Sequence, residues 1–118
     1  MLQEFEPGDY LIFQIESGYG LLRVLAIEGP DEAPVWHVAA YDDLFLDAET
    51  ADAAIDSGTL TIGHPHLPLT NRAFESTQVS RMQNKPLTAD ELRAYQRWQE
   101  EPLREISDRS VRLMLGLR

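Results

Sequence analysis

Three histidines are the side chains of this chain best suited to acid–base or metal chemistry. His64 and His66 flank one proline, and in an extended segment this spacing puts both imidazoles on the same side, as a metal pair requires. No third ligand follows at a zinc-site spacing, so we interpret the segment as a proline-punctuated loop, with the metal pair as the alternative. His37 lies in an apolar stretch beside Trp36, where a half-buried imidazole with a backbone or carboxylate partner is expected.

Short motifs that would assign a catalytic activity do not occur. The chain has no cysteine, which excludes disulfides, thiolate metal sites and a cysteine nucleophile. It has no Gly-x-Ser-x-Gly nucleophile elbow and no P-loop, and Gly18 and Gly20 lack the third glycine and the following helix of a dinucleotide site. We therefore assign no catalytic residue and expect no cofactor.

Carboxylates are concentrated in the first half of the chain. Residues 1–60 hold thirteen of them against one cation, Arg23, whereas residues 61–118 hold nine cations and seven carboxylates. This acidity argues against nucleic acid and anionic membranes as partners of the first half. The densest cluster predicts either an ordinary solvated face or a surface for a basic protein partner, since carboxylates lose water favourably only when they meet Arg or Lys. Its members are Asp42, Asp43, Asp47, Glu49, Asp52 and Asp56. The spacing does not match a calcium-binding loop.

The elements that must position these residues begin with a β-hairpin. Residues 10–16 and 21–28 are rich in β-formers and are separated by Ser-Gly-Tyr-Gly. The second of these strands is apolar on both faces, which predicts a central position with something covering each side. Residues 35–41 predict a third strand of the same antiparallel meander.

A short helix is predicted next, because Asp47 can cap its start and Gly58 can end it. Residues 60–62 resume as a short strand, after which Pro65 and Pro68 are expected to break any regular ladder. Asn71 then suits the start of a helical turn.

Residues 78–82 are compatible with an edge strand.

Two amphipathic helices are predicted in the last third of the chain. Thr88 and Glu91 form a capping-box pattern that starts the first helix at Ala89, and Pro102 suits the first turn of the second. The apolar stripe of the second helix would consist of Leu103, Ile106, Ser110, Leu113 and Leu117.

These elements predict a single α+β domain over residues 1–118, sheet-rich and acidic over 1–70 and helical over 86–118. Its core would be a curled antiparallel sheet of four or five strands, an SH3-like partial barrel, with one short helix between strands and two C-terminal helices. The acidic N-terminus does not match a signal peptide, and no apolar stretch is long enough to cross a bilayer, so we expect a cytoplasmic protein that does not bind membranes.

The stretch from Gly8 to Ile15, followed by Gly18 to Leu25, resembles the opening of a bacterial toxin-immunity family, the twenty-sixth in the common family numbering. A Gly-Asp pair, a β-run, a Gly/Tyr turn and an Arg-Val-Leu triplet carry the resemblance, which covers residues 8–28. Leu22 stands where another glycine is expected. The resemblance implies a toxin inhibitor that acts through its surface and has no catalytic residues.

The leading hypothesis is thus a non-catalytic acidic protein-interaction module, of immunity type, that binds a basic partner. The alternative is a small enzyme or ligand-binding protein whose pocket between sheet and helices uses His37, His64 or His66 as an acid–base group. A third possibility is a homo-oligomer formed through an exposed Trp98 and the terminal helix.

Overall fold

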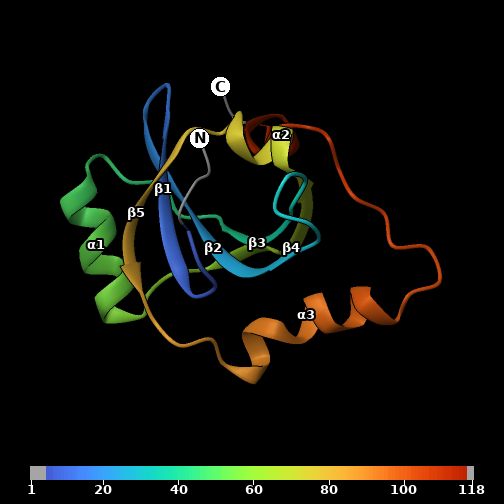
Figure 1. Cartoon of the computed structure of the whole chain (residues 1–118). Helices are drawn as coiled ribbons and strands as arrows, with labels where there is room; N and C mark the ends of the chain where they lie inside the picture. The colour runs from blue at the N-terminus through green and yellow to red at the C-terminus, as the bar shows by residue number, and fades with distance from the viewer. Residues whose placement is uncertain (1–4, 117–118) are drawn as a thin grey trace.

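The computed structural model describes residues 5–116 and has the predicted α+β class (Figure 1). Its five strands form one antiparallel sheet in the order β4-β3-β2-β1-β5, which over these residues is curled and not closed into a barrel. The elements along the chain are β1 (Asp9–Ile15), β2 (Gly18–Glu28), β3 (Val35–Tyr41), α1 (Ala48–Ser57), β4 (Ile62–Thr70), α2 (Asn71–Glu75), β5 (Val79–Asn84), α3 (Ala89–Glu100) and α4 (Val111–Met114).

The central strand β2 buries both of its faces, as its sequence predicts. Leu22 and Val24 point into the larger core, where α2 and α4 contribute Phe74 and Val111. Leu21 points to the opposite face, where α1 packs through Ala51 and Ile55 in the smaller core. The first turn of α3 lies against the same face of β2, two residues after Leu21, where its Glu91 pairs with Arg23. We call this second face the α1/α3 face.

Two glycines of the hairpin allow close approaches that a side chain would prevent. Gly20 lies opposite Phe13 in the β1–β2 register, and a Cβ on Gly20 would come within 2.6 Å of the Phe13 ring. A Cβ on Gly18 would come within 2.3 Å of the carbonyl oxygen of Phe45. The hairpin therefore needs Gly18 so that the chain after β3 can lie against its turn.

The caps of α1 and α3 are as predicted. The Asp47 side chain accepts a hydrogen bond from the Thr50 amide, and Gly58 ends α1 in the left-handed conformation with φ 69°. Thr88 and Glu91 form a complete capping box at the start of α3. The short helix α2 is capped by Thr70 rather than by the predicted Asn71.

The prediction for the strand β4 is wrong in its bounds. We expected a strand over 60–62 that stops before the prolines, whereas β4 runs from Ile62 to Thr70 through both Pro65 and Pro68. A proline has no amide hydrogen to donate. The strand tolerates both prolines because it lies at the edge of the sheet, where one side of the strand has no neighbouring strand to bond. Its register with β3 shifts between Val38 and Tyr41, where the ladder is irregular.

The predicted helix from Pro102 is also wrong. The chain turns extended at Glu101, with φ −73° and ψ 141°, and only Val111–Met114 forms a helix. Ser107 instead bonds to the edge of β4, donating from its amide to the Pro68 carbonyl and accepting from the Thr70 amide. Leu103 is consequently exposed, and Leu117 lies outside the described residues. Over residues 5–116, each helix falls short of the length and apolar character needed to span a bilayer.

Candidate functional site

The structure brings two of the three histidines together with a carboxylate that the sequence reasoning did not connect to them. Nδ1 of His37 lies 2.9 Å from Nε2 of His66, and Nε2 of His37 lies 2.7 Å from Oε1 of Glu28. These residues come from β3, β4 and β2 respectively, so three neighbouring strands of the α1/α3 face supply the row. His37 is completely buried, whereas His66 and Glu28 are half-buried.

The proton positions in this row follow from what each partner can do. The ionised Glu28 only accepts, so His37 donates from Nε2 and its Nδ1 accepts a bond that His66 donates from Nε2. Burial lowers the pKa of His37, an effect that Glu28 partly offsets. Burial, and then the neighbouring His37, lower the pKa of His66 to about 4. The pKa of Glu28 is also lowered, since bonds from Tyr95 and His37 outweigh the opposing effect of burial. Both imidazoles are therefore neutral at pH 7.

Helix α3 lies over this row and covers it. The rings of Tyr95 and Trp98 lie 4.6 Å and 4.7 Å from the His37 ring, and Gln99 donates a bond to the Tyr95 hydroxyl. Trp98, which we expected to be exposed, is half-buried against His37 and also donates to the carbonyl of Glu105. The arrangement is a polar clasp that holds α3 to the sheet, and we call Glu28, His37, His66, Tyr95 and Trp98 the histidine clasp.

Two features of a catalytic or metal site, a nucleophile bonded to the imidazole and a third metal ligand, are absent from the clasp in residues 5–116. No hydroxyl or further carboxylate in residues 5–116 is hydrogen-bonded to His66, and the rings of α3 cover His37. Within the same range no group of three or more His, Asp or Glu side chains is arranged to hold a metal ion. His64 lies opposite Ala40, across the irregular part of the ladder from His66. The irregularity interrupts the simple alternation that led us to place both imidazoles on one side.

We expect the clasp to make stability depend on pH between about 6.5 and 4. The unfolded chain binds protons on its histidines near pH 6.5, whereas folded His66 stays neutral until its pKa of about 4. Acidification through this window therefore favours the unfolded state. The contribution that neutral His66 makes to the free energy of unfolding is fully present above pH 6.5 and is lost by about pH 4. The variant His66→Gln keeps a donor for His37 but cannot titrate. Between these two pH values its free energy of unfolding, measured in urea, should fall by about 1–3 kcal/mol less than that of the wild type.

The comparison depends on the other groups that face His66, which are Glu28 on β2, His37 on β3 and Tyr95 on α3. The variant retains all three, so the proton binding of these groups contributes to both proteins and cancels in the difference between them. His64→Gln serves as the matched control, because His64 is outside the clasp. Equal acid sensitivity of the wild type and His66→Gln would show that His66 is not the source.

The predicted acidic cluster lies in the loop between β3 and α1 and on α1 itself, and four of its six members have structural roles. Asp47 caps α1, and Asp43 accepts from the Thr61 amide at 2.8 Å. Asp52 accepts from Nε2 of Gln83, and Asp56 pairs with Lys85 at 3.6 Å. Asp42 and Glu49 are exposed, and across residues 5–116 no side-chain hydrogen bond or ion pair is found for either.

Within residues 5–116, the second half of the chain supplies one cation to this cluster, Lys85. Among the ion pairs of the described residues, Asp56 is the cluster's one participant. Arg72 and Arg93 pair instead with Asp108 and Asp90, which belong to the same half of the chain. Five of the six carboxylates therefore have no ion pair within the described residues.

Two large apolar side chains are exposed inside the same loop. Leu44 is 52% exposed and Leu46 is 85% exposed. Between them, Phe45 is half-buried against the smaller core and forms a bridge with Tyr19, with backbone bonds of 2.8 Å and 2.9 Å. The loop is thus fixed to the β-hairpin while its leucines face solvent. We use the name acidic–apolar surface for the exposed residues of this region, which are Asp42, Leu44, Leu46, Glu49 and Ile62. Ile62 is included because it is the register partner of Tyr41, the residue before Asp42.

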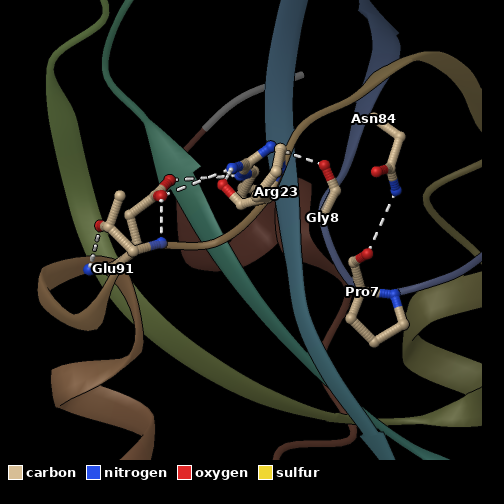
Figure 2. A network of polar contacts seen from close by, with 7 residues as sticks. Pro7, Gly8, Arg23, Asn84 and Glu91 are labelled. Atoms are coloured by element: carbon tan, nitrogen blue, oxygen red, sulfur yellow. Dashed lines mark hydrogen bonds and ion pairs between the residues drawn. The ribbon is translucent and has the colours of Figure 1, made fainter.

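A buried polar network joins the sheet to the start of α3 (Figure 2). Arg23, which is 1% exposed, donates from Nη1 to the Gly8 carbonyl at 2.5 Å and from Nη2 to the Pro86 carbonyl at 3.2 Å. Its Nε lies 3.2 Å from Glu91 Oε2, and the guanidinium lies over the Tyr10 ring at 4.0 Å. The sequence reasoning counted Arg23 as a charge and did not anticipate its burial.

Comparison of the chain with family models, with curated proteins and with solved structures finds no match.

Proposed function

We propose that this protein is a non-catalytic interaction module that binds a basic protein through the acidic–apolar surface. The observation that carries the proposal is the exposure of Leu44 and Leu46 on a loop that Phe45 fixes to the β-hairpin. Exposed apolar patches rimmed by polar residues mark interaction sites. A fixed loop loses little conformational entropy on binding, so it is suited to present them.

Charge decides the kind of partner. The exposed leucines are flanked by Asp42, Asp43 and Asp47 in the sequence, and the cluster is largely without cationic partners of its own. A partner that presents lysines or arginines around an apolar contact would complement both properties, and the field would accelerate its approach. The resemblance of residues 8–28 to a toxin-immunity family fits such a role, with a toxin as the basic partner.

The test begins with capture from a native lysate by three forms of the chain. These are the wild type, the double variant Asp42→Lys/Glu49→Lys, and the control Asp31→Lys/Glu32→Lys, which has the same charge change in the exposed loop between β2 and β3. The side chains of the substituted acids make no hydrogen bond or ion pair over residues 5–116, and the backbone bond from Asp42 to Thr61 is unaffected by the change, so each variant should fold. The captured protein is then purified and titrated calorimetrically against each form at about 50 and about 300 mM salt.

We expect the surface variant to bind at least about tenfold more weakly than the wild type, and the control to change less than about threefold. Binding should also weaken at the higher salt concentration, because the attraction is between exposed charges. Equal affinity for all three forms, or a captured partner that is acidic, would contradict the proposal.

A further inference from the structure

A cavity of about 170 Å³ opens on the α1/α3 face beside the first turn of α3. Helix α1 covers one part of this face through Ala51 and Ile55, and α3 covers another through the histidine clasp. The strands between them are left uncovered over a small area. The apolar wall of the cavity is made by Leu25, Ala39, Tyr41, Ile62 and Pro65.

The polar groups at the rim of the cavity already have partners. The Arg23 guanidinium is bonded to Glu91 and to two backbone carbonyls, and Asp90 pairs with Arg93. A charged group placed deep in the cavity would therefore lose water without gaining a partner. An apolar group would lose nothing, and an apolar cavity of roughly 150 Å³ accommodates a benzene ring. The volume and the apolar wall of the cavity therefore suit one aliphatic or aromatic group.

The cavity and the acidic–apolar surface share one residue. Ile62 belongs to both, and it is 44% exposed. Tyr41 is the register partner of Ile62, and the next residue, Asp42, has its carboxylate so close to Gly63 that a Cβ there would clash with it. Asp90 at the rim is paired with Arg93, whereas Asp42 beside Gly63 has no side-chain partner in residues 5–116, so it places uncompensated negative charge next to Ile62 at the opening.

We propose that this cavity is the anchor pocket of the interaction, which receives one apolar side chain of the basic partner while neighbouring lysines or arginines meet the carboxylates at its mouth. This inference rests on the proposed function, because it identifies where that partner is held. Interfaces commonly concentrate their binding energy in one such side chain inserted into a pocket.

The pocket can be tested without knowing the partner. The full chain is titrated, with NMR detection of its methyl groups, with three end-blocked tripeptides: Lys-Phe-Lys, Lys-Ala-Lys and Glu-Phe-Glu. Lys-Phe-Lys should shift the methyl signals of Leu25, Ala39 and Ile62 in a saturable way. Lys-Ala-Lys, which lacks the anchor, and Glu-Phe-Glu, which is repelled at the mouth, should each bind at least tenfold more weakly.

The variant Ala39→Leu, which extends a wall residue into the cavity, should abolish the shifts caused by Lys-Phe-Lys. The peptide comparison on the wild type stands by itself if this variant does not fold. Equal binding of Lys-Phe-Lys and Lys-Ala-Lys, or no shift at the wall residues, would overturn the anchor pocket. Equal binding of Glu-Phe-Glu would overturn its link to a basic partner. Neither result affects the calorimetric test of Asp42→Lys/Glu49→Lys, so failure of the pocket and failure of the proposed function are distinguishable.

Discussion

Substitution of Arg23 by alanine is expected to lower the free energy of unfolding by about 3–5 kcal/mol. The guanidinium joins β2 to two carbonyls, those of Gly8 and Pro86, and to the carboxylate of Glu91 in the first turn of α3. Its removal leaves the buried Gly8 carbonyl without this donor and the partly buried carboxylate without its cation. The measurement is urea unfolding, followed by tryptophan fluorescence.

The matched control is Arg93→Ala, which removes the partner of Asp90 from the same turn of α3. That pair is exposed, so its loss should change the free energy of unfolding by less than about 1 kcal/mol. Arg23→Lys should be intermediate, since an ammonium retains the charge but cannot make the forked contacts of a guanidinium. A loss below about 1 kcal/mol for Arg23→Ala would contradict the structural role given to this network.

The parts of the fold that the sequence predicted correctly are those decided by local chemistry. The Asp47 cap, Gly58 and the Thr88–Glu91 capping box each depend on residues within a few positions of one another. The burial of both faces of β2 follows from its own near-continuous run of apolar residues. These features can therefore be predicted without knowledge of any tertiary contact.

The errors arise where distant segments compete with local preference. The stretch after Pro102 has helical periodicity, but Ser107 gains two backbone bonds at the open edge of β4, and these hold it extended. Likewise, β4 continues through two prolines because β3 supplies its pairing and its other edge needs few donors. No pattern within either segment reports these partners.

The candidate sites also differ in whether local sequence or distant contacts determine them. The acidic cluster could be read from composition, although Asp43 and Asp52 turn out to bond to Thr61 and Gln83, which come much later in the chain. The link between His37, His66 and Glu28 crosses three strands, so it depends on sheet order and register. The one available signal was that Glu28 and His37 end and begin adjacent antiparallel strands, which a hairpin register would have placed near each other.

Phe74→Ala should be as damaging as Arg23→Ala, with an expected loss of about 3–5 kcal/mol. Phe74 is completely buried, stacks on Trp36 with ring centroids 4.0 Å apart, and meets the edge of the Phe5 ring at 5.9 Å. It is the main side chain through which the short helix α2 reaches the larger core. Truncation leaves a cavity that such a short helix cannot collapse to fill.

Phe74→Leu, which retains much of the apolar volume, should cost only roughly 1–2 kcal/mol, and the exposed Leu103→Ala should change the free energy of unfolding by less than about 0.5 kcal/mol. Because Phe74 packs on the face opposite the acidic–apolar surface, the folded fraction of Phe74→Leu should bind the partner with wild-type affinity. This separates stability from binding: a variant that loses stability without losing affinity shows that the surface acts independently of the larger core. Equal losses for Phe74→Ala and Phe74→Leu would instead indicate that aromatic stacking, and not filled volume, stabilises this core.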